Sequence, residues 1–170
     1  MNSILKAGAI LLILTSAACT RPDRFGGGAG AAGAGTAPGA LSGSTAAPNS
    51  PQYFSEAIGD RVLFAVDTST LTPEGKTILD GQARWLLANS DYNAIIEGHA
   101  DEQGTREYNL ALGFRRANAV REYLVSQGVP AGRLEVTSYG KERPIEVCSN
   151  EACYAKNRRA VTVLSFARIS

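Results

Sequence analysis

The composition of the chain changes sharply near residue 51, and this change limits what can fold. Between Gly26 and Pro51 the chain is built almost entirely of Gly, Ala, Ser, Thr and Pro, with hardly a large apolar side chain. Such a segment cannot bury enough apolar surface to offset the entropy that it would lose on ordering. The sequence therefore predicts a disordered tether here, and it confines the folded domain to residues 53–170.

The first 18 residues have the composition of an export signal. Lys6 is followed by the apolar run AGAILLIL and then by small residues up to Cys19. A basic residue, a short apolar run and a small-residue cleavage site are typical of secretory signals, and a membrane span would need about 20 apolar residues. Residues 16–19, SAAC, resemble the cleavage box of bacterial lipoproteins, although Ser16 stands where such boxes more often have Leu.

The lipobox resemblance implies that residues 1–18 are removed and that Cys19 carries lipid. The alternative is simple secretion with an incidental cysteine. Thr20 replaces the Asp that retains enteric lipoproteins in the inner membrane, so the outer membrane is favoured. Residues 19–52 would then form a lipidated linker, whose Gly-rich coil would average roughly 30 Å end to end. The domain would face the periplasm of a Gram-negative bacterium.

From Pro51 onward the chain has 14 basic and 15 acidic residues, which excludes the strongly basic surface of a typical nucleic-acid binder. Cys148 and Cys153 lie close together in an exported domain, which favours a local disulfide over two free thiols. His99 is the only histidine, so no metal site is expected. We expect His99 instead to hold a turn through a hydrogen bond. No cofactor is expected.

Strand-like and helix-like segments alternate through the domain. Thr72 and Pro73 provide a helix N-cap and first position, and Gly128 and Pro130 follow the end of a second helix. The predicted strands are 61–66, 94–97, 133–138 and 160–166, and the predicted helices are 73–89, 106–127 and a short one at 151–157. This order predicts an α/β (α+β) two-layer sandwich, βαβαβ(α)β, with the helices on one face of a small sheet.

The segment 106–127 combines an apolar stripe with polar residues at its side. A helical wheel places Leu110 with Ala117, Val120 and Leu124, and it places Asn109 and Arg116 within about 20° of each other at the margin of that stripe. A margin arginine can bind a carboxylate with two hydrogen bonds, although such residues are more often structural. Asp101, in the preceding loop, could bind an ammonium group. The pair would suit a zwitterionic ligand.

The motifs EGHADEQGTREYNLALGFRRANAV, SYGKERP and AKNRRAVTV, in this order, resemble the OmpA-like peptidoglycan-binding domain over about residues 61–164. The resemblance implies a ligand, the meso-diaminopimelate of an uncrosslinked peptide stem. By motif position the ligand-binding residues would be Asp101, Asn109 and Arg116. The strand end that usually reads FDFD reads FAVD here, which keeps Asp67 but replaces an acid and an aromatic by Ala65 and Val66.

The NRRA run supplies two further arginines to this family comparison. Arg158 is expected to line the site, and Arg159 to face the sheet edge or solvent. The resemblance implies a non-enzymatic anchor between the outer membrane and the cell wall, with no catalytic residues. It also implies the Tol–Pal system as a partner, with TolB acting on the same domain and a role in cell division. The alternatives are a peptidoglycan-cleaving enzyme, for which no acid and base pair is evident, and a stator subunit, which would need a transmembrane helix with an acidic residue.

Overall fold

The computed structural model describes residues 46–166, so the predicted signal segment, Cys19 and most of the tether lie outside the described residues. In chain order the elements are α1 (Pro51–Tyr53), a π-helical turn (Phe54–Gly59), β1 (Arg61–Leu63), α2 (Pro73–Ala88), β2 (Tyr92–His99), α3 (Arg106–Ser126), a 3-10 turn (Ala131–Arg133), β3 (Leu134–Gly140), α4 (Glu151–Asn157) and β4 (Arg159–Phe166).

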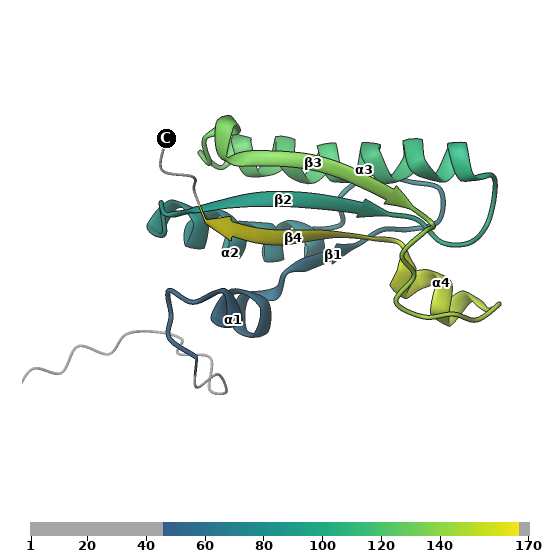
Figure 1. Ribbon diagram of the computed structural model, residues 1–170, viewed down its shortest axis with the longest axis horizontal. Helices are drawn as coiled ribbons and strands as arrows, with labels where there is room; N and C mark the ends of the chain where they lie inside the picture. Colours follow the sequence, from purple (N-terminus) through teal and green to yellow (C-terminus); the bar gives the residue numbers. More distant parts are fainter. Residues whose placement is uncertain (1–45, 167–170) are drawn as a thin grey trace, which may run out of the picture. The chain divides into compact units, whose positions relative to one another are not determined.

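The strands form one sheet in the order β1-β4-β2-β3, shown in Figure 1. β4 is antiparallel to both of its neighbours, whereas β2 and β3 are parallel and joined through α3. Helices α2 and α3 cover one face, and the core lies between them and that face, with Leu79, Leu86, Ile96, Val120 and Leu124 fully buried. The predicted two-layer α/β sandwich is confirmed.

Local capping determines where the two long helices begin. The side chains of Thr72 and Thr105 accept hydrogen bonds from the backbone N–H groups of Gly75 and Tyr108, so each satisfies a donor that the first turn leaves free. Gly128, with a φ of 98°, lies just beyond α3. Its left-handed conformation ends the helix at low cost because glycine has no Cβ.

Two close glycines bring α3 onto the middle of the sheet. A Cβ on Gly98 of β2 would lie 1.8 Å from the carbonyl oxygen of Gly113, and a Cβ on Gly113 would lie 2.8 Å from that of Gly98. Only glycine at both positions permits this backbone contact. The helix therefore sits deep enough to bury side chains that a looser packing would leave at its margin.

This deep packing corrects the predicted orientation of α3. Leu110 was expected in the apolar stripe but is 50% exposed, whereas Asn109 and Arg116 are 1% and 0% exposed. The buried arc is centred on Gly113 and Val120, so it includes the two polar residues and leaves Leu110 outside. The margin position assigned to Asn109 and Arg116 is therefore wrong, because both lie within the buried face.

The ends of the domain also differ from the sequence prediction. The first strand stops at Leu63 instead of Val66, because the chain turns away after the Phe64 N–H donates to the carbonyl of Arg158. Packing begins before the boundary assigned at residue 53. The indole Nε1 of Trp85 donates to the carbonyl of Pro48 over 2.8 Å, and Phe54 packs against the same indole. The last residues assigned to the linker are thus held against the domain.

Candidate functional site

A pocket of about 230 Å³ opens where the loops after β1 and β2 meet the start of α3. Three of the five predicted ligand-binding residues line it: Asp67 from the first loop, Asp101 from the second, and Asn109 from the helix. Its other lining residues are Val66, Gln103, Gly104, Tyr108 and Leu112. Arg116 and Arg158 are absent from this lining. The structure therefore brings two carboxylates to one pocket and places the two arginines behind it.

Asp101 is held by two hydrogen bonds. Its Oδ1 accepts from the backbone N–H of Gln103, and its Oδ2 accepts from Nη1 of Arg158 over 3.1 Å. Arg158 also binds Glu151 through Nη2 and the carbonyl of Phe64 through Nε. Burial acts to lower the pKa of Arg158, but the hydrogen bonds to Glu151 and Asp101 outweigh it and raise that pKa. Arg158 is a permanent cation that lies between two carboxylates.

Asn109 fixes the loop that carries Asp101. Its Nδ2 donates to the carbonyls of Asp101 and Gln103, over 3.2 and 2.7 Å. An amide can make both bonds at once because its nitrogen carries two hydrogens. The structure thus gives Asn109 a positioning role in addition to its place in the pocket wall.

Arg116 holds the loop that carries Asp67. Its Nε, Nη1 and Nη2 donate to the carbonyls of Thr68, His99 and Ala65, over 2.8, 2.9 and 3.1 Å. Burial lowers the pKa of Arg116 to about 10, against the opposing charge of Asp101, so the guanidinium stays protonated at neutral pH. Because Ala65 and Thr68 bracket Asp67, this one side chain shapes the turn at the pocket mouth.

Asp67 has a strained backbone and a defined partner. Its φ is 53°, and within residues 46–166 no other non-glycine residue has a left-handed backbone conformation. Its carboxylate accepts a hydrogen bond from the hydroxyl of Tyr108, a residue that the sequence analysis did not single out. Tyr108 directly precedes Asn109 in the motif EYNLAL, and this position next to a predicted ligand-binding residue was the one sequence signal that could have identified it. Val66, which stands where the family usually has an aromatic residue, lies in the pocket wall.

Glu151 is the second residue that the sequence analysis missed. It lies in the loop closed by Cys148 and Cys153, which the structure joins in a disulfide with Cα atoms 6.1 Å apart. Asn150 caps the following helix by accepting from the backbone N–H of Cys153, so Glu151 begins α4 with a fixed direction toward Arg158. No sequence motif marked this carboxylate, because its partner is defined only by the fold.

Two expectations for neighbouring residues are wrong. Arg159 was expected at the sheet edge or in solvent, but it is buried and donates to the carbonyls of Asn157 and Arg143. His99 was expected to hold the turn through its side chain. Its ring is 2% exposed, stacks on Tyr139, and neither ring nitrogen has a hydrogen-bond partner among the described residues. The turn is held instead through the backbone carbonyl of His99, which Arg116 binds.

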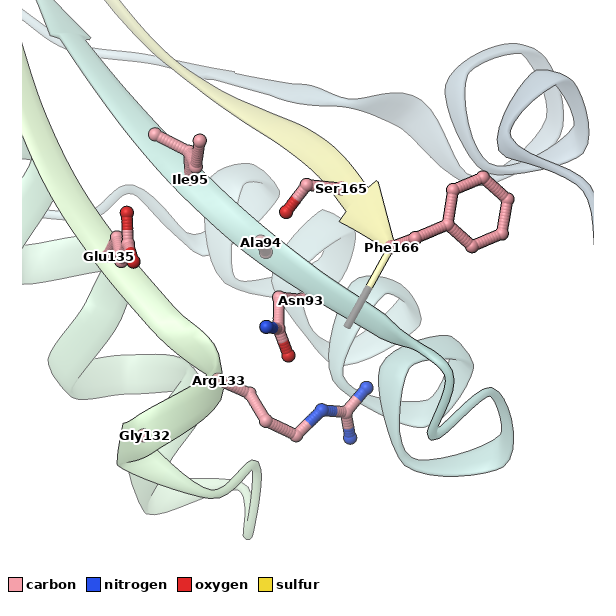
Figure 2. Close-up of a pocket in the computed structure, with 8 residues that line it drawn as sticks. All are labelled: Asn93, Ala94, Ile95, Gly132, Arg133, Glu135, Ser165 and Phe166. Atoms are coloured by element: carbon pink, nitrogen blue, oxygen red, sulfur yellow. The ribbon is translucent and has the colours of Figure 1, made fainter. Parts of the chain in front are cut away.

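A second polar pocket, of about 280 Å³, lies between the start of β2, the start of β3 and the end of β4 (Figure 2). Asn93, Glu135 and Ser165 surround it, but the guanidinium of Arg133 is engaged by the carbonyls of Leu86, Asn89 and Tyr92. This pocket has one carboxylate, Glu135, and its arginine is already engaged, so the first pocket, with two carboxylates, remains the candidate site. Within residues 46–166 no group of three His, Cys, Asp or Glu side chains could hold a metal ion. No helix in that range is long and apolar enough to cross a membrane.

Comparison with known proteins places this geometry in a family. The model of the OmpA family matches residues 63–158. A peptidoglycan-associated lipoprotein of Rhizobium meliloti is 52% identical over 124 residues, which cover 73% of this chain and 70% of the relative. A peptidoglycan-associated lipoprotein of Agrobacterium fabrum is 46% identical over 156 residues, which cover 92% of this chain and 85% of the relative. The crystal structure of the peptidoglycan-associated lipoprotein from Burkholderia pseudomallei has a TM-score of 0.61 and 39% identity, covering 62% of this chain and 90% of that one.

Proposed function

Because this chain belongs to the OmpA family, we propose that it is an outer-membrane lipoprotein whose domain binds peptidoglycan non-covalently and so anchors the membrane to the cell wall. Relatives that are about half identical over most of the domain carry the name peptidoglycan-associated lipoprotein. The observation that carries the proposal at the level of residues is the meeting of Asp67 and Asp101 in one pocket, with two buried guanidinium groups behind it.

The two carboxylates suit an ammonium group of the ligand. In Asp101 each oxygen already accepts one hydrogen bond, but a carboxylate oxygen has two acceptor positions, so both keep capacity for a further donor. Asp67, at the pocket mouth, accepts from the Tyr108 hydroxyl and is otherwise open. We assign to this pair the ammonium at the end of a meso-diaminopimelate side chain in an uncrosslinked stem peptide.

The carboxylate at the same end of diaminopimelate requires a positive partner, and Arg116 and Arg158 supply it. Arg116 uses three of its five N–H donors on backbone carbonyls. It is covered by the turn at Ala65 to Thr68, so a ligand carboxylate reaches it when that turn moves outward. Arg158 needs less movement, since Glu151 can release one side of its guanidinium. Asn109 keeps the loop of Asp101 in place during binding.

The remaining parts of the chain suit an anchor. Lipid on Cys19 would hold the N-terminus in the outer membrane, since each buried acyl methylene contributes about 0.8 kcal/mol. The Gly-rich tether would let the domain reach the wall. Modest affinity at each site is enough, because many anchored copies act on an array of stems. We further propose that the chain works within the Tol–Pal system, that TolB acts on this domain, and that the domain has no catalytic activity.

Co-sedimentation of the purified protein with isolated peptidoglycan tests the wall-binding proposal. We expect the protein to pellet with the wall, and free meso-diaminopimelate to release it. Protein that stays in the supernatant would contradict the proposed wall binding. Protein that pellets but is not released by free meso-diaminopimelate would contradict only the assignment of the ligand. Turbidity of the same suspension should stay constant, because an enzyme would clear it.

Cys19→Ala tests the anchor separately. We expect the variant to leave the membrane fraction or to accumulate as unprocessed precursor, because the described domain offers no apolar helix in its place. Labelling with palmitate should mark the unmodified chain and not the variant. Unlabelled protein that still fractionates with the outer membrane would count against lipidation.

A further inference from the structure

β3 forms one edge of the sheet and is paired on one side only among the described residues. Figure 1 shows it outermost, with α3 behind it. An edge strand presents unpaired N–H and C=O groups, and proteins usually protect such edges with Pro, Lys or a covering segment. The strand sequence LEVTSYG contains neither Pro nor Lys, and its one charged side chain is Glu135. This edge is therefore open to pairing with another strand.

An apolar groove of about 560 Å³ lies beside this edge, between α3 and β3. Leu110 and Phe114 form its helical wall, and each is 50% exposed. Ala111, Val136, Thr137 and Ser138 complete most of the lining. Large apolar side chains that gather at an exposed groove mark an interaction surface more often than scattered ones do.

The two ends of this surface carry opposite charges. Glu107 lines the groove near the end of β3, and the Nε of Arg121 donates to the carbonyl of Leu134 at the start of β3. Neither side chain has an ion-pair partner among the described residues. Glu107 and Arg121 lie seven residues before and after Phe114, on the face of α3 that flanks the edge.

The helix and the strand share one midpoint. α3 runs opposite to β3, because Ser138 near the end of β3 donates to Leu110 near the start of α3, over 2.7 Å, whereas Arg121 farther along α3 donates to Leu134 at the start of β3. From Glu107 to Arg121 a helix rises about 21 Å, and from Leu134 to Gly140 a strand rises about 20 Å. The centre of the helical row, Phe114, therefore lies level with the centre of the strand, near Thr137.

We propose that this surface binds a second copy of the chain through a two-fold axis at Thr137. β3 would pair with β3 of the second copy in antiparallel fashion and extend the sheet across both domains. The axis reverses the direction of α3, so Glu107 of each copy meets Arg121 of the other, and the apolar pairs Leu110 and Phe114 pack together at the centre. Such an interface is isologous and closed. Self-complementary charge selects a second copy over an unrelated partner.

A cysteine at the axis tests this geometry in the full-length chain in cells. Directly opposed residues of antiparallel strands have Cα atoms about 4.5–5.5 Å apart, within the range for a disulfide. Thr137→Cys should therefore give a covalent dimer on mild oxidation, at least about tenfold above an Arg84→Cys control on the exposed face of α2. Equal dimer yields from the two variants would overturn the proposal.

Charge reversal provides a second test. It separates a specific interface from crosslinking by chance collision, which would not respond to these substitutions. In the Thr137→Cys background, Glu107→Arg or Arg121→Glu should each lower the dimer yield by about fivefold, because each places like charges in contact at both ends of the interface. The two reversals together should restore it. Yields that do not respond to the single reversals, or that are not restored by the double reversal, would refute the arrangement. Melting curves of each variant exclude unfolding as the cause.

Discussion

Arg158 lies between Asp101 and Glu151 and hydrogen-bonds both, so the first basic residue of NRRA connects the pocket to the disulfide loop. Asp101 comes from the loop after β2, Glu151 from the start of α4, and Arg158 from the junction between α4 and β4. A change in any one of them therefore alters the charge around Asp101 in the pocket.

Replacing Asp101 by Asn should release the domain from the wall. The amide keeps nearly the shape of the carboxylate but loses the charge that attracts the ligand ammonium, and removal of one partner of a buried charge pair costs about 2–5 kcal/mol. We expect at least about a thirtyfold loss of peptidoglycan affinity by co-sedimentation. Arg84→Ala, on the exposed face of α2, is the control and should bind normally. A folded Asp101→Asn protein that pellets as well as the control would show that the site is elsewhere.

Arg116→Lys should destabilise the fold. A lysine ammonium cannot span the carbonyls of Ala65, Thr68 and His99 with the planar fork that the guanidinium provides. We expect a loss of about 2–4 kcal/mol in the free energy of unfolding, measured by urea titration. The neighbouring Arg115 is exposed, so Arg115→Lys is a matched control that should stay within about 0.5 kcal/mol. Equal stability of the two variants would contradict the role of Arg116 in holding the turn.

Removal of the disulfide should weaken both stability and wall binding. The chain-entropy model gives about 2 kcal/mol for closing so short a loop. Cys148→Ser with Cys153→Ser also frees Glu151, so Arg158 should hold Asp101 in a less defined position. Calorimetry and co-sedimentation measure the two effects. Glu151→Gln, which leaves the disulfide intact, should reduce binding alone; unchanged binding in both variants would show that the loop does not support the pocket.

His99 should make the domain less stable in mild acid. Burial, with the charges of Arg159 and Arg143, lowers the pKa of His99 to about 4, although Glu97 lies 3.8 Å from its Nε2. The unfolded chain, with an ordinary pKa near 6.5, binds the proton first. Stability is therefore complete above about pH 6.5 and is lost as the pH falls toward 4, by about 2 kcal/mol at pH 5.

Urea unfolding at pH 7.5 and pH 5 measures this loss. His99→Phe keeps an aromatic ring against Tyr139 without a titratable group, so its stability should change less between the two pH values. If the variant and the unmodified protein lose the same amount, other groups titrate instead.

Gly98→Ala should be among the most damaging single substitutions in the core. The added Cβ would lie 1.8 Å from the carbonyl oxygen of Gly113, so α3 must move off the sheet. We expect a loss of at least about 3 kcal/mol and a lower melting temperature by circular dichroism. Gly132→Ala, where no atom lies within 4 Å of the new Cβ, should be nearly neutral. Similar melting temperatures for both variants would contradict the proposed close contact.

The order of the elements could be predicted from the sequence because its signals are local. Thr72 and Thr105 cap helices within three residues of themselves, and Gly128 ends α3 in the same way. The short helix α4 was predicted with the bounds that the structure gives it, Glu151–Asn157. The N-terminal boundary was less visible, because the bond from Trp85 to Pro48 spans 37 residues.

The burial of the site residues could not be predicted from these local signals. The three carbonyls that bind Arg116 come from residues 17, 48 and 51 positions away along the chain. A helical wheel contains no information about how closely a helix approaches its sheet, and the contact between Gly98 and Gly113 decides that distance here. Glu151 was missed for a related reason, since its partner Arg158 becomes its neighbour only once α4 forms.

The hydrogen bond from Trp85 to Pro48 also determines how the domain responds to tension. Trp85 packs against Tyr92 at the start of β2, while Asp101 lies just beyond the end of that strand. A pull between the N-terminal segment and a ligand in the pocket would therefore be directed along β2, over about 23 Å. β3 and β4 flank β2 on both sides, so their hydrogen bonds lie across the direction of the pull and share the load. Under such a pull the domain would be loaded in shear, a geometry in which many bonds must fail together, whereas peeling would break them one at a time.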